Sequence, residues 1–241
     1  MIRRLASLLP DTLQEELRRF RFLSRARSGR FSPNEPESDI LERFVSLGDW
    51  VIDVGANVGQ YTLLLSKLVG PAGRVLAFEP MTTTVATLAS VAARYSAYHN
   101  VSVLNMAASD HSGILSFELP IDQSGLRNYE RAQVSQNGKT PVFGIPIDAL
   151  QLTKRLSLAK IDAEGHEPQV LNGMRHTIER DLPVLIVEDN CELLPDFLYR
   201  LGYVSEKLRS DSPNVILSIT GTSRNDDFAA GTSVSNGIAL A

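Results

Sequence analysis

The sequence is poor in cysteine and in long apolar runs. Cys191 is its single cysteine among 241 residues, so an intramolecular disulfide cannot form and a secreted fold built on disulfides is excluded. No apolar run approaches the roughly 18–20 residues of a membrane-spanning helix. Residues 1–10 begin like an export signal, with two arginines and a short apolar patch, but Pro10 and Asp11 end that patch too early. We therefore expect a reducing, cytoplasmic location.

The sequence also lacks an overall basic surplus. Its formal net charge is −4 and its pI is about 5.6. This balance gives no support for a general nucleic-acid-binding protein, so we expect no nucleic-acid partner. The remaining composition, 43% hydrophobic and 22% charged, is ordinary for a globular protein that can bury a large core.

The basic residues are concentrated at the N-terminus. The first 30 residues hold eight arginines against three acidic residues, while the whole chain is acidic. Asp11 can cap a helix that places four apolar side chains on one side, namely Leu13, Leu17, Phe20 and Leu23. A basic amphipathic helix can lie on an anionic membrane or dock on a partner, which predicts peripheral membrane contact through residues 1–30. The interpretation we favour is that the helix packs its apolar stripe on its own domain.

Strand and helix signals alternate from residue 38 onward. Short apolar runs that end at glycine, proline or polar residues predict strands, and apolar residues at helical spacing predict helices. This alternation predicts an α/β fold with a mostly parallel sheet covered on both faces. The predicted strands are 50–54, 74–79, 101–106, 156–161, 183–188, 203–208 and 215–219, and the predicted helices are 38–45, 58–69, 82–97, one from Pro168 through Ile178, and 193–201.

We expect one main domain, residues 38–219, between two smaller segments. Residues 1–31 form the basic helical segment, followed by a polar, proline-containing linker, and residues 220–241 form a polar tail that we expect to be disordered. Inside the domain, residues 113–119 alternate like an exposed strand. Residues 122–140 are polar and turn-rich, which predicts that the segment 119–146 is a loop or a cap over a substrate site, and residues 142–150 return to extended character.

A glycine-containing turn follows the first predicted strand, from Asp53 to Gly59. Gly55 and Gly59 let the backbone turn sharply and approach a ligand closely. The turn lacks the G-x-G-x-x-G spacing of dinucleotide-binding proteins, which disfavours an oxidoreductase. Asp53 would repel a pyrophosphate but can accept hydrogen bonds from an ammonium group, and Glu79, at the end of the second strand, can accept two from a ribose diol. The alternative is a turn with structural glycines and a solvated glutamate.

These residues resemble the FkbM-type methyltransferase family. The stretch VIDVGANVGQYTLLLSKLVGPAGRVLAFEP resembles the first cofactor motifs of that family, which begin at Asp53. The agreement continues in Ala107–Gly113, in the block Lys160–Glu167 and in Val187-Glu188, and it covers about residues 38–219. The block at Lys160 is the more family-specific one, whereas many methyltransferases share the glycine turn.

The resemblance implies a fold, a cofactor and its binding residues. The fold is a three-layer, Rossmann-like class I methyltransferase fold, with a seven-stranded, mostly parallel sheet and a C-terminal antiparallel hairpin. The implied cofactor is S-adenosylmethionine (SAM). Its implied contacts are Asp53, Gly55, Asn57 and Gly59 beside the methionine part, Glu79 at the ribose, and Ala108, Ser109 and Asp110 near the adenine.

Candidate catalytic residues follow the fourth core strand, namely Asp162, Glu164 and His166. Methyl transfer to a hydroxyl requires an aligned acceptor and a base or metal ion that assists removal of its proton. Asp162 is the best candidate by its place and by the family motif, and His166 can serve as a base near neutral pH. The alternative is that Glu164 and Glu167 cap the following helix, and for Glu167 we favour this structural role.

A magnesium site is a further hypothesis. Glu188, Asp189 and Asn190 close the fifth strand, beside the fourth, and their oxygens together with Asp162 can form an octahedral site. Catechol-type methyltransferases are similar here, but FkbM-type sequences do not regularly show this Asp-Asn pair.

Three functions are compatible with these motifs. The resemblance favours O-methylation of a sugar or of a secondary-metabolite hydroxyl, with a small-molecule or glycan acceptor that residues 119–146 select. The alternatives are N-methylation of an amine or peptide group, and a non-catalytic cofactor-binding module whose basic helix recruits a partner or a membrane.

Overall fold

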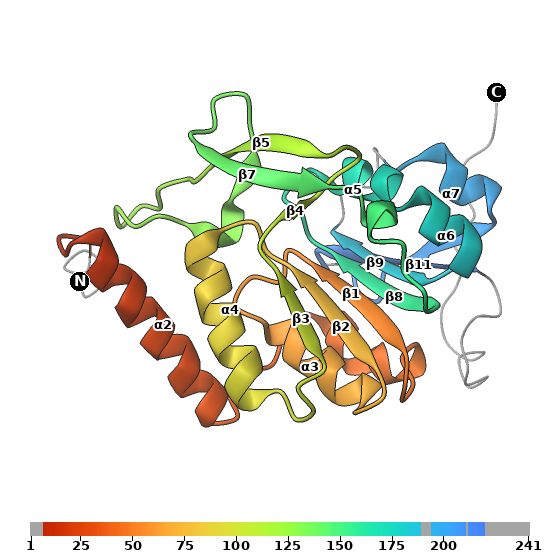
Figure 1. The fold of residues 1–241 in the computed structure, drawn as a ribbon, viewed down its shortest axis with the longest axis horizontal. Coiled ribbons are helices and arrows are strands. Elements are labelled where there is room, and N and C mark those ends of the chain that lie inside the picture. The colour runs from red at the N-terminus through yellow and green to blue at the C-terminus, as the bar shows by residue number, and fades with distance from the viewer. Residues whose placement is uncertain (1–6, 189–193, 211, 220–241) are drawn as a thin grey trace.

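The protein is built around one large sheet. The structure, a computed structural model, describes residues 7–188, 194–210 and 212–219. The sheet has seven strands in the order β10-β11-β9-β8-β1-β2-β3 (Figure 1). Only β11 runs antiparallel to the other six strands. This confirms the mostly parallel sheet with its C-terminal hairpin. The strands are β1 (Trp50–Val54), β2 (Arg74–Phe78), β3 (Val101–Leu104), β8 (Leu156–Ile161), β9 (Val184–Glu188), β10 (Tyr203–Glu206) and β11 (Asn214–Ile219).

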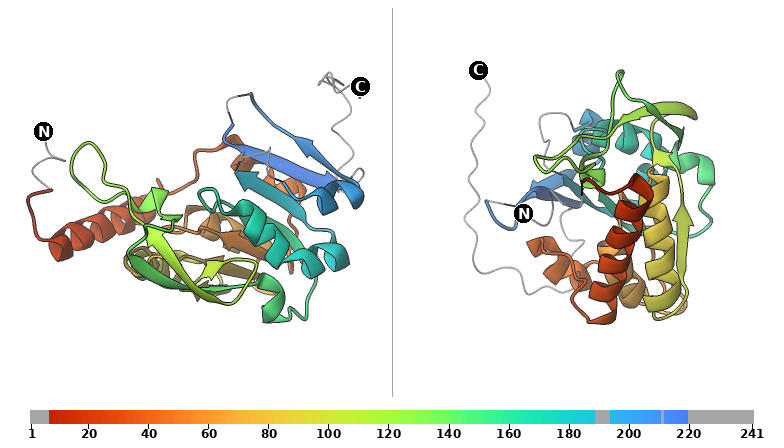
Figure 2. Two further views of the ribbon diagram at one scale, coloured as in Figure 1. Left: turned by 90° about the horizontal axis from the view of Figure 1, so that it is seen from above. Right: turned by 90° about the vertical axis from the view of Figure 1, so that its left-hand side faces the viewer.

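Helices cover both faces of this sheet, because its central strands are apolar on both sides (Figure 2). Val51 packs with Leu65 in the core under the first helical layer, whereas its neighbour Ile52 packs with Met174 in the core under the second. The first layer contains η1 (Pro36–Arg43), α3 (Gln60–Val69) and α4 (Thr82–Tyr95), and the second contains α5 (Glu167–Gly173), α6 (Arg175–Asp181) and α7 (Asp196–Arg200).

Two helices differ from the sequence prediction. The helix predicted at 38–45 is the 3-10 helix η1, which begins two residues earlier at Pro36. The single helix predicted after Pro168 is divided into α5 and α6 at Met174. The carboxylate of Asp148 explains the new start, because it accepts hydrogen bonds from the backbone N–H groups of His176 and Thr177, each at 2.8 Å.

A second, four-stranded sheet lies beside the large one, in the order β4-β7-β5-β6 (Figure 1). The expected exposed strand at 113–119 is confirmed as β5, whose residues alternate between buried and exposed. Residues 119–146, predicted as a loop or cap, also contribute two strands to this sheet. The elements are β4 (Ala107–Ala108), β5 (Gly113–Glu118), η2 (Tyr129–Arg131), β6 (Gln133–Val134), β7 (Thr140–Ile145) and η3 (Ile147–Leu150).

The linker before the domain is fastened to the C-terminal hairpin. Glu37 is fully buried, and its carboxylate accepts hydrogen bonds from the side chains of Ser212 and Asn214. Two segments that are far apart in the sequence are therefore joined through one buried acid.

The N-terminal helix α2 (Asp11–Arg27) lies beside α4, outside the three layers (Figures 1 and 2). Phe22 is buried and meets the ring of Phe31 edge to face, at 6.3 Å between centroids. The expected cap by Asp11 is wrong: Pro10 holds the N-cap position, and the Asp11 carboxylate pairs with Arg127 at 3.1 Å.

The apolar stripe of α2 faces away from the domain. Leu13, Leu17 and Phe20 are 45%, 49% and 73% exposed. The interpretation we favoured from the sequence, that this stripe packs on its own domain, is therefore wrong for these three residues. Leu23, the fourth predicted member, is partly buried and packs against the cluster that contains Phe22, so only this member of the stripe meets the domain.

Candidate active site

A cavity of about 980 Å³, including its open mouth, lies at the carboxyl ends of β1, β2 and β8. Ligands in parallel α/β sheets bind at this edge. The second sheet and the cap close one side of the cavity. Its wall includes Asp53, Gly55, Asn57, Glu79, Ala108, Asp162, Glu164 and His166.

The glycine turn forms the floor of the cavity. Gly55 has φ +73°, and a Cβ there would lie 1.9 Å from the carbonyl oxygen of Asp162, so no side chain fits. Asn57 also has a positive φ, of 48°. Gly59, at φ +98°, is not among the lining residues of the cavity. A Cβ on it would meet Leu88 of α4 at 2.7 Å, so Gly59 allows α3 and α4 to pack closely.

Asp53 lies buried at the end of β1. Its carboxylate accepts a hydrogen bond of 2.5 Å from the hydroxyl of Thr62. Burial raises the pKa of Asp53 to about 6, although the hydrogen bond from Thr62 and the charge of Lys160 oppose this. A cationic ligand group in the cavity would therefore stabilise its carboxylate form.

Glu79 joins the end of β2 to the glycine turn. Its two carboxylate oxygens accept hydrogen bonds from the backbone N–H groups of Asn57 and Met81, each at 2.9 Å. Burial nevertheless raises the pKa of Glu79 to about 7. Each oxygen keeps a second lone pair, so the carboxylate can still accept hydrogen bonds from a ribose diol.

The residues after β3 divide into two groups. Ala108 lines the cavity, whereas Asp110 is not among its lining residues and binds Nδ1 of His111 at 2.6 Å through its carboxylate. The buried hydroxyl of Ser109 lies 3.0 Å from Nε2 of His166. Burial lowers the pKa of His166, so its imidazole is neutral near pH 7 and is held in place by Ser109.

Asp162 follows the end of β8, next to the glycine turn. The ammonium group of Lys160 lies 3.1 Å from its Oδ2 atom, and the lysine side chain is almost entirely buried. Lys160 also lies 5.3 Å from the ring centroid of Tyr61, which lines the same cavity. The ion pair fixes one oxygen of Asp162 and leaves its other oxygen for a ligand.

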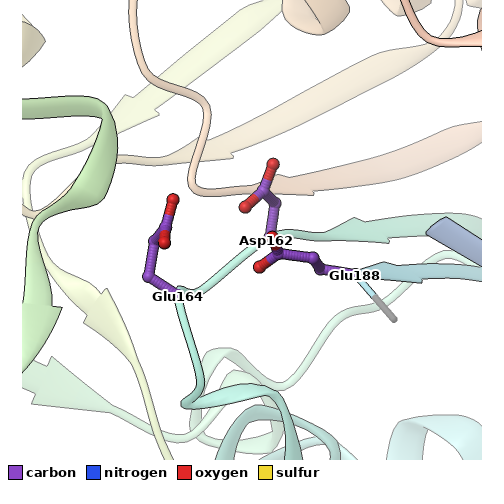
Figure 3. Close-up of side chains that lie close together, drawn as sticks. All are labelled: Asp162, Glu164 and Glu188. Carbon is purple, nitrogen blue, oxygen red and sulfur yellow. The ribbon is translucent and has the colours of Figure 1, made fainter. Parts of the chain in front are cut away.

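Three carboxylates meet at the edge of the cavity, and two of them, Asp162 and Glu164, belong to its wall. Donor oxygens of Asp162, Glu164 and Glu188 all lie within 4.8 Å of one another, and Figure 3 shows the side chains extending toward one shared space. Burial first, and then the neighbouring carboxylates, raise the pKa of Glu188 to about 7 and raise that of Glu164. This group can hold a proton or a cation. Asp189 and Asn190 of the magnesium hypothesis lie outside the described residues.

Glu167 serves the loop that carries these acids. Its buried carboxylate accepts hydrogen bonds from the backbone N–H groups of Ala163 at 2.8 Å and Gly165 at 3.2 Å. Glu164 stands in this loop with φ +50°. Glu167 therefore holds the backbone conformation that brings Glu164 to the cavity.

Sequence reasoning missed several residues of the wall. Tyr61 belongs to the apolar pattern of a helix, yet it lines the cavity, and its buried hydroxyl has no hydrogen-bond partner within the described ranges. Glu35 lines the cavity from the linker. Tyr129 and Glu130 reach it from the cap. The residues that line the cavity do not recur at a regular spacing in the sequence. Only Lys160, two residues before Asp162, could have been recognised from the sequence as a part of the site.

Comparisons with known proteins identify the family of this chain. Residues 53–205 match the model of the methyltransferase FkbM domain. The chain belongs to the FkbM methyltransferase family. It is 30% identical over 187 residues to hexuronic acid methyltransferase AglP of Haloferax volcanii, covering 76% of this chain and 70% of that protein. It is 27% identical over 172 residues to Methyltransferase 1 of Beauveria bassiana, covering 61% of this chain and 67% of that protein.

A solved FkbM methyltransferase from Methylobacillus flagellatus has a similar fold, with a TM-score of 0.51 and 21% sequence identity over 70% of this chain. This chain spans 43% of the length of that structure. The expected Rossmann-like class I methyltransferase fold is thereby confirmed. Residues 53–205 of the present chain are therefore a SAM-dependent methyltransferase domain.

The cavity fits SAM in its polar chemistry. The side-chain oxygen of Asn57 and the hydroxyl of Tyr61 are buried without a hydrogen-bond partner in the part of the chain that the structure describes. Both residues line the cavity together with Asp53 and Glu79. Buried polar groups are normally paired, so these two atoms indicate a polar ligand at this position.

Proposed function

We propose that this methyltransferase transfers the methyl group of SAM to a hydroxyl of a sugar or of another small molecule. The observation that carries the proposal is the position of Asp162. Asp162 lies on the cavity wall, with its backbone against the glycine turn, and Lys160 fixes its carboxylate. The relative named as a hexuronic acid methyltransferase supports a sugar acceptor.

In the proposed cofactor half, the glycine turn and two acids hold SAM. Gly55 and Asn57 give its methionine part close access to the backbone, Asp53 attracts its ammonium group, and Glu79 accepts hydrogen bonds from its ribose. Ala108 borders the adenine. Asp110 and Gly59, expected as direct contacts, lie outside the cavity wall, and we assign them to supporting the turns around it.

In the proposed acceptor half, Asp162 accepts the proton of the reacting hydroxyl. SAM, when bound, would supply an activated methyl group on its sulfonium, with S-adenosylhomocysteine as the leaving group. Asp162 orients the hydroxyl for this in-line displacement and takes up its proton. Lys160 positions Asp162. His166, neutral and fixed by Ser109, is the second candidate base.

The acidic group favours a neutral or cationic acceptor. Asp162, Glu164 and Glu188 would repel a carboxylate-bearing substrate unless a proton or metal ion neutralised them. An amine acceptor would find the same group attractive, so N-methylation is the second candidate function. A divalent cation held by these oxygens remains a third hypothesis, and it is the one that allows a uronic acid as acceptor.

Calorimetric titration tests the cofactor half first. The intact protein should bind SAM and S-adenosylhomocysteine with micromolar affinity, and Asp53→Ala and Glu79→Ala should each lose this binding. Asp39→Ala, which removes an exposed aspartate outside the cavity, is the matched control and should bind like the intact protein. Absence of binding in the intact protein would refute the assignment of the cavity to SAM.

An acceptor screen tests the second half. Neutral sugars, uronic acids and amines are incubated with SAM, with and without magnesium and a chelator, and methylated products are identified by mass and by the methylated atom. Methylation of hydroxyls in the presence of chelator supports the proposal. Methylation confined to amines would replace it with N-methylation, and loss of all activity with chelator would establish the metal site.

A further inference from the structure

The outer side of α2 carries an apolar stripe without a partner on the described part of the chain. Leu13, Leu17 and Phe20 follow one another at spacings of four and three residues, so they lie on one side of the helix, about 10 Å long. All three are exposed, Phe20 to 73%. Exposed apolar side chains that form a stripe, rather than standing singly, indicate a surface that binds something.

The inner side of α2 is firmly attached, so the stripe is presented by a fixed helix. Phe22 is buried against Phe31, and the guanidinium of Arg19 donates a hydrogen bond of 2.9 Å to the hydroxyl of Ser90 on α4. Glu15 accepts one from Tyr129 at 3.2 Å. Because these contacts use the inner side, the stripe is free to bind without α2 leaving the domain.

Positive charge lies at the C-terminal end of the stripe. Arg21 and Arg27 are both exposed. Arg21 lies one helical turn beyond Leu17, and Arg27 lies two turns beyond Phe20 on the same side of the helix. The first 30 residues have eight arginines against three acids in a protein whose formal net charge is −4. A partner that complements this surface would offer apolar groups to the stripe and negative charge to the arginines beside it.

We propose that the outer side of α2 docks on an anionic lipid membrane. Leu13, Leu17 and Phe20 enter the interface between headgroups and acyl chains, and Arg21 and Arg27 bind lipid phosphates. The helix lies in the plane of the surface, and no helix among the described residues is long and apolar enough to cross a bilayer. The whole methyltransferase is thereby held at the membrane as a peripheral protein.

The size of the stripe favours lipid over a second protein chain. Stable protein interfaces bury about 800 Å² on each partner, far more than three side chains of one convex helix provide. An interfacial helix needs only a few apolar side chains, because each basic residue near an anionic surface adds about a fivefold gain in binding.

Vesicle co-sedimentation of the full chain tests the proposal without requiring enzymatic activity. Vesicles of phosphatidylcholine with phosphatidylglycerol are compared with pure phosphatidylcholine, each at low and high salt. We expect binding to the anionic vesicles, weakened by salt, and little binding to the neutral ones. Phe20→Glu and Leu17→Glu should each reduce binding by at least about tenfold, and Arg27→Ala by about fivefold.

Matched variants separate the stripe from a general loss of apolar surface. Ile114 is 67% exposed and Val204 is 50% exposed, close to the values of Phe20 and Leu17, and both lie on strands away from α2. Ile114→Glu and Val204→Glu should bind vesicles like the intact protein. Glu16→Gln, which removes an exposed acid from α2, should strengthen binding. Thermal unfolding confirms that each variant is folded.

Three results would overturn the proposal. The first is no binding to anionic vesicles at low salt, and the second is binding that the Leu17 and Phe20 variants leave unchanged. The third is a concentration-dependent dimer in analytical ultracentrifugation that Leu17→Glu abolishes, because the stripe would then be covered by a second copy.

Discussion

The two halves of the cavity are built in different ways. The floor, formed by β1, β2 and β8, depends on buried groups and backbone geometry: Asp53 and Glu79 are buried, and Gly55 touches the backbone of Asp162. The cap depends on side-chain contacts that are partly open to solvent. The difference teaches that the floor tolerates few substitutions. Substitutions in the cap, by contrast, can alter which acceptor fits while the floor of the cavity stays intact.

The cap is held from outside the domain core. Its Arg127 pairs with Asp11, and its Tyr129 donates a hydrogen bond to Glu15 and lies 4.7 Å from the guanidinium of Arg18. All three partners stand on α2. The helix that we propose to bind a membrane therefore also supports the cap, whose Tyr129 lines the cavity.

Breaking the floor should have the largest effect. Gly55→Ala places a methyl group against the carbonyl oxygen of Asp162 at a positive φ, so we expect a loss of several kcal/mol in unfolding free energy and no SAM binding. Gly165→Ala is the matched control, because its φ is +90° but nothing lies within 4 Å of its new Cβ. It should lose only about 1–2 kcal/mol. Urea denaturation measures both, and equal losses would contradict the close-contact argument.

Removing the proposed base should affect turnover and leave the floor intact. We expect Asp162→Asn to lower kcat by about 10²–10⁴ with little change in the Kd of SAM, because only proton transfer and acceptor alignment are lost. Glu164→Gln, its neighbour in the acidic group, should lower kcat by less than about tenfold. Steady-state kinetics and calorimetry decide this, and a larger effect for Glu164→Gln would transfer the role of base to Glu164.

Two buried acids of the cavity and the half-buried Glu188 beside them predict a pH dependence of stability. The pKa values of Asp53, Glu79 and Glu188 are raised to about 6, 7 and 7. Above the ordinary pKa of about 4, the folded protein therefore keeps protons that the unfolded chain has lost. The unfolding free energy should fall as pH rises from about 4 to about 7. Urea denaturation across this range checks it.

Glutamine variants identify the groups responsible for that pH dependence. Glu79→Gln and Glu188→Gln should each make the pH profile flatter. A profile that they leave unchanged would show that these acids do not control it.

The link between α2 and the cap should give the smallest effect. Asp11 and Arg127 are both more than half exposed, so a double-mutant cycle with Asp11→Asn and Arg127→Gln should give a coupling of about 0.2–1 kcal/mol. The acceptor KM should rise slightly and the Kd of SAM should stay constant. A change in SAM affinity as large as that in acceptor KM would contradict the separation of the two halves.

The sequence was informative where chemistry and periodicity coincide. β1 and β8 were predicted to the residue, because each is a buried, mostly apolar run with an aspartate within one residue of its end. Parallel strands bring their carboxyl ends to one edge, so Asp53 and Asp162 were expected together. Tyr61 was hidden in a helical pattern, since periodicity records burial and does not distinguish a core from a cavity.

Long-range contacts explain the remaining errors. The division between α5 and α6 depends on Asp148, which lies 28 residues before the N–H group that it caps. β7 begins at Thr140, two residues before the predicted extended segment, because β5 pairs with it there although Pro141 weakens the strand signal. For α2, the sequence shows apolar residues on two sides of the helix but not which side meets the domain.

Glu37 decides where this chain can be shortened. A protein that begins at residue 32 keeps the buried carboxylate for Ser212 and Asn214, and keeps Glu35 at the cavity. One that begins at residue 38, the predicted domain boundary, would leave those two buried polar groups without their acid. For expression and crystallisation, a shortened chain should therefore keep Glu37 and start before the first predicted helix of the domain.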